Sequence, residues 1–171
     1  DPVLLCDPTG FPRIMWHPIP AGLRFAQTNE EVIQFFEDGR TWRDIWTDGR
    51  KLPNEDAELR WYGYSVGHWE GDTFVVNSNG FEESTWLDQY GSPHSDAMTV
   101  EERYRRVGPD RLEMTLNITD PKTYTGTWKG DKKIFQRVEK SRSAFNDLNE
   151  NICAYSEVKL HGKAWDKVHP K

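Results

Sequence analysis

The sequence predicts an all-β domain, an antiparallel meander of about eight strands that forms a closed or nearly closed barrel. Short runs rich in β-branched and aromatic residues recur along the chain, and tight turns such as Asp38-Gly39 and Asp48-Gly49 separate them. Aromatic residues make up 13% of the chain, which suits a wide core or a pocket lined by rings. A closed barrel leaves no unpaired strand edge, so we favour it over the alternative, a two-sheet sandwich.

At 171 residues the chain suits a single domain. We expect an N-terminal arm over residues 1–21, the barrel over residues 22–138 and a tail over residues 139–171, with a short helix between Ala144 and Tyr155. The Ile14-Met15-Trp16 patch of the arm is expected to cover apolar surface, and docking of the arm on a neighbouring subunit would give a homo-oligomer. Five prolines predict an extended arm rather than a helical one: Pro2, Pro8, Pro12, Pro18 and Pro20.

The first three strands are predicted over Leu23–Gln27, Glu31–Phe36 and Thr41–Trp46, joined by polar and Gly-containing turns. A helix from Asn29 to Glu37 is the competing interpretation, because its apolar residues also suit helical spacing. The crowding of β-branched and aromatic residues in so short a segment favours a strand.

The stretch from Trp61 to Phe81 predicts a central hairpin. Tyr64–Trp69 and Thr73–Val76 are its strands, and Glu70-Gly71-Asp72 is a turn whose glycine takes a positive φ without penalty. The second strand is apolar on both faces, as expected for a strand that is covered on both sides.

Two further strand pairs are expected after an irregular segment over residues 82–95. That segment is too rich in Gly, Pro and Ser for a regular element, and too aromatic for an ordinary solvent loop. The first pair joins Met98–Val107 to Arg111–Thr119. The second is a hairpin of Tyr124–Trp128 and Lys133–Val138 that turns at Lys129-Gly130-Asp131.

Alternation along the strand after Ser95 places Met98, Val100, Glu102, Tyr104 and Arg106 on one face. This face holds the apolar residues, so we expect it to be the core side, with Glu102 pointing inward. An unpaired buried carboxylate is costly. Glu102 is therefore either paired with Arg106 or another interior arginine, or it serves as a pocket acid or base with a shifted pKa. The return strand directs these residues inward: Leu112, Met114, Leu116 and Ile118.

His94 is the second candidate for chemistry, because it lies in the irregular segment that leads into the strand of Glu102. A loop imidazole at a barrel mouth transfers protons near neutral pH; the alternative is a surface histidine capped by Asp96. Asp88 could orient His94. The candidate catalytic residues are Glu102, His94, Tyr104 and Asp88. The candidate ligand-binding residues are Trp69, Trp86, Arg106 and Asn77.

Several classes of function are disfavoured. A net charge of −6 argues against nucleic-acid binding, and no apolar stretch approaches bilayer length. We find no phosphate loop or dinucleotide fingerprint, and so expect no cofactor. No histidine spacing indicates zinc or copper, so no metal is expected, although Asp88, His94 and Asp96 could hold a hard divalent cation.

The two cysteines, Cys6 and Cys153, lie near opposite ends of the chain. One disulfide in an exported protein is the favoured interpretation, and two free thiols are the alternative.

Five blocks of sequence together resemble a family of exported bacterial proteins of uncharacterised activity. The resemblance runs from about Cys6 to Tyr155, and it implies bacterial origin and export to the periplasm or the cell exterior. Gly67-x-Trp69 is also similar to a motif of lipocalin-type barrels, but those barrels carry it on their first strand, so this likeness concerns architecture alone. The five blocks are Gly67-His68-Trp69-Glu70-Gly71-Asp72-Thr73, Thr85-Trp86-Leu87-Asp88, Pro93-His94-Ser95-Asp96-Ala97, Glu102-Arg103-Tyr104-Arg105-Arg106 and Asp120-Pro121.

These observations support three hypotheses of function. The first is cofactor-free acid–base chemistry of the lyase, hydratase or isomerase type on a small molecule, with Glu102 and His94 exchanging protons and Tyr104 donating a hydrogen bond to developing charge. The second is a binding or carrier protein with the same aromatic pocket and an apolar or aromatic ligand. The third is a structural or interaction domain whose aromatic residues form only the core.

Overall fold

The computed structural model describes residues 1–16, 22–138, 148, 152–154 and 156. These residues form an all-β fold, which confirms the predicted class. Two short 3-10 helices, η1 (Pro2–Leu5) and η2 (Arg13–Trp16), precede a single sheet. The expected helix over Ala144–Tyr155, and nearly all of the tail, lie outside the described residues. The strands are β1 (Leu23–Gln27), β2 (Glu31–Phe36), β3 (Trp42–Trp46), β4 (Tyr64–Glu70), β5 (Thr73–Asn79), β6 (Thr99–Gly108), β7 (Arg111–Thr119), β8 (Trp128–Lys129) and β9 (Lys133–Gln136).

Neighbouring strands in the sheet follow the order of the chain from β1 to β8, and β9 also pairs with β7. Every pair is antiparallel except β3 with β4, which pair in parallel through Ile45 opposite Ser65 and Trp46 opposite Val66. The sheet is therefore mixed, and the prediction of a purely antiparallel meander is wrong at this pair. The connection over residues 47–63 is long enough to carry the chain back to the starting end of β3, as a parallel pair requires.

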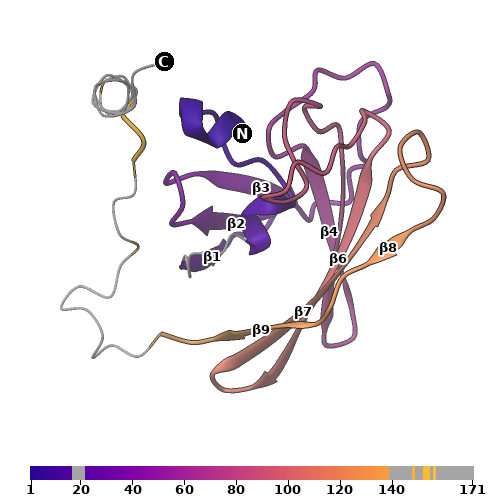
Figure 1. Cartoon of the computed structure of the whole chain (residues 1–171). Helices are drawn as coiled ribbons and strands as arrows, with labels where there is room; N and C mark the ends of the chain where they lie inside the picture. The colour runs from indigo at the N-terminus through magenta and orange to yellow at the C-terminus, as the bar shows by residue number, and fades with distance from the viewer. Residues whose placement is uncertain (17–21, 139–147, 149–151, 155, 157–171) are drawn as a thin grey trace, which may run out of the picture.

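The sheet curls into a half-barrel, with β1–β3 set at an angle to the longer strands β4–β7 (Figure 1). In the described part of the chain β1 pairs with β2 alone, and β8 and β9 form the opposite edge. The sheet is thus open, and the predicted closed barrel is not confirmed.

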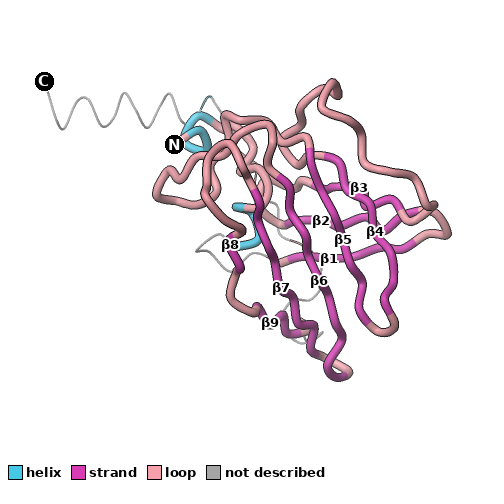
Figure 2. The backbone as a smooth tube through the Cα atoms, turned by 90° about the vertical axis from the view of Figure 1, so that its right-hand side faces the viewer, coloured by secondary structure: helices cyan, strands magenta, loops and turns pink. Residues whose placement is uncertain are grey.

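The predicted hairpin after residue 124 is wrong, because β8 and β9 do not pair with each other. Both lie antiparallel to β7 as successive pieces of one edge (Figure 2). Ile118 lies opposite Trp128 and Met114 opposite Lys133, a register shift of one residue between the two pieces. Such a shift is the signature of a β-bulge. Gly130 occupies this interruption, and its amide donates to the carbonyl of Leu116 at 2.8 Å.

The described part of the N-terminal arm, residues 1–16, contains two 3-10 helices and is not extended throughout, and Pro2 occupies the first position of η1, where proline is tolerated. Phe11, Ile14 and Met15 are buried in the main core, and the ring of Phe11 stacks on that of Phe81 with centroids 6.0 Å apart. The expectation that this part of the arm covers apolar surface is confirmed. The described part of the arm therefore contributes three side chains to the core of the curled sheet.

A disulfide joins Cys6 in the arm to Cys153 in the tail, with the two Cα atoms 5.5 Å apart. The favoured interpretation of the cysteines, a single disulfide, is the one that the structure contains. The bond closes a loop between residues 147 positions apart, so it restricts the unfolded chain strongly.

We expect replacement of both cysteines (Cys6→Ser with Cys153→Ser) to lower the free energy of unfolding by about 3–5 kcal/mol, because the released unfolded chain gains entropy. Urea denaturation followed by tryptophan fluorescence measures the change. Reduction of the unmodified protein should produce a similar loss, whereas an equal stability of the two proteins would contradict the assignment.

Candidate functional site

Glu102 lies on β6 with no exposed surface, and its carboxylate faces the interior as alternation predicted. Nη2 of Arg43, on β3, lies 2.8 Å from Oε1 and 2.7 Å from Oε2. Only the first of these contacts has the alignment of a hydrogen bond, so Oε2 takes part in the ion pair without one. The hydroxyl of Tyr104 also donates to Oε1. Of the alternatives for Glu102, the structure contains the salt bridge with an interior arginine.

Arg106 is not that arginine, and its predicted inward position is wrong. Its side chain is exposed and donates to the carbonyls of Gly108 and Pro109 at 3.1 and 2.7 Å. The pairing of β6 with β7 is irregular between Arg106 and Gly108. Arg106 itself is still paired in register with Leu112, so its exposure follows from its position near the end of β6, where the neighbouring residues are exposed as well.

The ion pair belongs to a buried polar cluster that the arm covers. Nε of Arg43 donates to Oε1 of Gln34 at 2.8 Å, and the guanidinium lies 4.0 Å from the centre of the Phe11 ring. Burial and the charge of Glu102 raise the pKa of Tyr104 well above its usual value, so the phenol keeps its proton and remains a donor. A carboxylate held in this way, with no exposed surface, is suited to fixing the core rather than to exchanging protons with a ligand.

His94 is buried on the segment before β6, and its ring contacts neither Glu102 nor Asp88 through a hydrogen bond. Nδ1 lies 3.2 Å from the carbonyl of Ser95, and Nε2 lies 2.6 Å from Oγ1 of Thr85. The carbonyl of Ser95 can only accept, but the single proton of the Thr85 hydroxyl can go either to Nε2 or to the carbonyl of Glu82 at 3.0 Å, so these contacts are compatible with either neutral tautomer of the imidazole. Burial lowers the pKa of His94, against the opposing charges of nearby acids, so the imidazole is neutral near pH 7.

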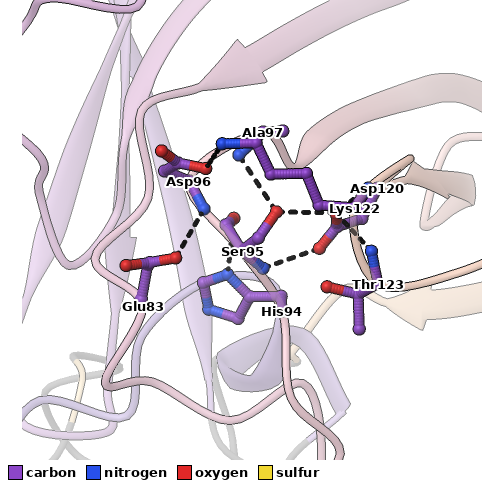
Figure 3. A network of polar contacts seen from close by, with 8 residues as sticks. All are labelled: Glu83, His94, Ser95, Asp96, Ala97, Asp120, Lys122 and Thr123. Carbon is purple, nitrogen blue, oxygen red and sulfur yellow. Dashed lines mark hydrogen bonds and ion pairs between the residues drawn. The ribbon is translucent and has the colours of Figure 1, made fainter.

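Asp120, directly after β7, anchors the segment that contains His94 (Figure 3). The amide and hydroxyl of Ser95 donate to its two oxygens at 2.6 and 2.7 Å, and the amides of Lys122 and Thr123 donate to it as well. Burial alone raises the pKa of Asp120, but the hydrogen bonds from Ser95 and Thr123 outweigh it and hold the pKa below its usual value. Asp120 therefore stays ionised and ties residues 93–97 to the turn after β7.

Asp88 stabilises its own loop and does not orient His94. It accepts from the hydroxyl of Ser92 at 2.6 Å and from the amide of Tyr90 at 2.7 Å. Burial opposes these hydrogen bonds without overcoming them, so the pKa of Asp88 is lowered. Asp96 pairs with Lys122 instead of capping His94. Asp88, His94 and Asp96 thus have separate partners, and no group of three or more ligating side chains in the described residues is placed to hold a metal ion.

The structure contains a cleft of about 750 Å³ at the β8 edge of the half-barrel. Its floor is the inner face of β7, and its walls come from η2, from the segment after β5 and from the chain between β7 and β9. The rings of Trp16 and Trp128 meet edge to face at the wall, 5.5 Å apart, and the indole N–H of Trp16 donates to the carbonyl of Leu87 at 2.7 Å. The cleft is lined by Trp16, Leu87, Asp88, Ser92, Met114, Leu116, Ile118, Tyr124, Thr125, Gly126, Thr127, Trp128, Gly130, Asp131 and Lys133.

The cleft exists because the edge of the sheet is interrupted here. β8 covers only two positions of β7 before the bulge at Gly130. Trp16 and the chain between β7 and β9 enclose apolar surface of β7 beside this interruption.

Of the candidate catalytic and ligand-binding residues, only Asp88, a candidate catalytic residue, lines this cleft, and none of the four predicted ligand-binding residues does. Trp69 is 57% exposed, and its ring lies against Phe74. Trp86 lies 5.6 Å from the guanidinium of Arg13, and alternation along β5 places Asn77 on the outer face of the sheet. Sequence reasoning did not select Trp16, Tyr124 and Trp128. The apolar patch Ile14-Met15-Trp16 of the arm could have indicated Trp16. Trp128 was not selected because it was assigned to a predicted hairpin.

Comparison with known proteins found no matching family, no matching curated protein and no matching solved structure. None of the helices in the described residues has the length and apolar character needed to cross a membrane.

We expect Glu102→Gln to lower the free energy of unfolding by about 3 kcal/mol, because it leaves the buried charge of Arg43 without its counter-ion. Glu101→Gln, one position away and on the other face of β6, is the matched control and should change stability by no more than about 0.5 kcal/mol. Chemical denaturation at neutral pH tests both. Equal stability of the two variants would show that the ion pair is not required.

We expect the stability of the protein to fall as the pH drops below about 6.5, the usual pKa of histidine. The folded-state pKa of His94 is lowered, so the unfolded chain takes up the proton first and protonation favours unfolding. Denaturation at about pH 7.5 and pH 5.5 measures the loss. The loss should disappear in His94→Gln and persist in His68→Gln, which removes an exposed histidine. Persistence of the full loss in His94→Gln would contradict the assignment.

Proposed function

We propose that the protein binds a small apolar or aromatic molecule in the cleft lined by Trp16, Trp128 and β7. The main observation in support is that the cleft combines an apolar floor with aromatic walls. Its volume of about 750 Å³ lies within the range of small-molecule sites. The floor residues, Met114, Leu116 and Ile118, belong to the main core, so the site is built on the packed face of the sheet.

The rim of the cleft carries charges of both signs, from Asp88 and Asp131 and from Lys133, so it selects strongly for neither an anion nor a cation. Asp88 is already occupied by hydrogen bonds from its own loop. Apolar contact and ring stacking are therefore the interactions that the cleft offers most readily.

Binding without turnover is the form of this proposal that the contacts support. The residues expected to perform acid–base chemistry do not meet in the cleft, because Glu102 is held by Arg43 and Tyr104 beneath the arm, and His94 is held by Thr85. Proton transfer to a substrate requires hydrogen-bond reach of the reacting group.

We further propose that the protein functions in an oxidising compartment, the periplasm or the cell exterior. The disulfide between Cys6 and Cys153 supports this, because such bonds persist mainly outside the reducing cytosol.

We expect indole or 2-naphthol to raise the melting temperature of the protein, because a ligand that binds only the folded state stabilises it. Trp128→Ala should weaken the binding by about tenfold, since it removes one wall of the cleft. Trp69→Ala is the matched control, because both indoles are at least half exposed and Trp69 lies outside the cleft. No thermal shift with either compound, or equal affinities of the two variants, would contradict the proposal.

A further inference from the structure

A second pocket, of about 260 Å³, opens where β3 and β4 separate. The two strands pair in parallel over only two residues of each, and before this point the chains diverge. The pocket is separate from the cleft described above, since the two share no lining residue.

Trp42 and Asp44 project from the same face of β3 at one side of this pocket. Trp42 is 58% exposed, and its ring stacks on no other ring and no cation in the described part of the chain. Asp44 is exposed, and within the described residues its carboxylate has no ion pair. Trp46, the next residue on this face, differs because the guanidinium of Arg50 covers its ring at 3.6 Å.

Arg60 lines the pocket from the chain that leads into β4. Its guanidinium lies 4.1 Å from the centre of the Tyr64 ring, which fixes its position. Among the described residues it has no ion pair, and its side chain donates no hydrogen bond, so its N–H groups are available to a ligand.

This set of groups matches the chemistry of a sugar ring. A pyranose has an apolar face of C–H groups that stacks on an indole, and hydroxyls at its edge that both donate and accept hydrogen bonds. Trp42 and Asp44 are two residues apart on one strand, about 7 Å, so hydroxyls at the edge of a ring stacked on Trp42 come within reach of the carboxylate. Asp44 supplies acceptors and Arg60 supplies donors, so the pocket offers both kinds of hydrogen-bond partner that sugar hydroxyls use.

We propose that this pocket binds one neutral hexose ring, either as a free sugar or as the end unit of a glycan. Trp42 stacks on the ring, Asp44 accepts hydrogen bonds from its hydroxyls and Arg60 donates hydrogen bonds to its oxygens. The volume of the pocket suits a single ring, and a longer chain would extend into solvent past the exposed edge of Trp42.

The test titrates the complete protein with glucose, galactose, mannose and their methyl glycosides, up to about 50 mM, and follows heat release or tryptophan fluorescence. At least one sugar should bind. Trp42→Ala should weaken that binding by about tenfold and Asp44→Asn by about fivefold. Trp69→Ala, with nearly the same exposure as Trp42, and Trp128→Ala, in the larger cleft, should leave the affinity within about twofold.

The methyl glycosides distinguish the two sources of the ring. Binding of a methyl glycoside at least as tight as that of the free sugar supports a glycan end, and binding of the free sugar alone supports a monosaccharide. The proposal is overturned if no sugar binds, if Trp42→Ala retains full affinity, or if Trp128→Ala abolishes sugar binding. The proposal is also overturned if benzoate or L-tryptophan displaces the bound sugar and if the same compound no longer binds to Trp42→Ala. The pocket would then select a charged aromatic ligand.

Discussion

The buried ion pair between Arg43 and Glu102 joins the two parts of the curled sheet. Arg43 lies on β3 and Glu102 on β6, with β4 and β5 between them in the order of the sheet. A direct contact between these strands requires the sheet to curl. Burial of two charges is costly, and it is tolerated only where close contact and hydrogen bonds compensate for the lost water. The contact therefore favours one curvature of the sheet over others.

The same ion pair fixes the position of the N-terminal arm. The guanidinium of Arg43 lies against the ring of Phe11, and the amide of Gln34 in the same cluster lies 3.6 Å from the sulfur of Met15. The arm covers the polar cluster and excludes water from it, which strengthens the electrostatic contact beneath. The cleft at Trp16 lies where this covering segment meets the interrupted edge of the sheet. Core packing and the candidate binding site thus depend on one segment of chain.

Much of the fold could be predicted from local sequence patterns. Alternation identified the inward set on β7 that includes Met114 and Leu116, and it placed Glu102 in the interior, because a strand in a half-buried sheet exposes only one face. The same rule could not show that Arg106 is exposed, because its place near the end of β6, and not the alternation, takes its side chain out of the core. It also could not show that Arg43 is the partner of Glu102, since pairing across 59 positions is set by the curl of the sheet.

The sequence by itself determined the strands from β1 to β7, the tight turns among them and the inward position of the carboxylate, because these follow from the period of two and from the conformations that glycine and proline allow. Only the tertiary structure decided three other features: the parallel pairing of β3 with β4, the bulge that splits the last strand, and the folded arm inside the curl. Each depends on contacts between segments far apart in the chain, whose free energies no local pattern expresses. Both pockets are formed by these long-range contacts, so neither could be located from the sequence.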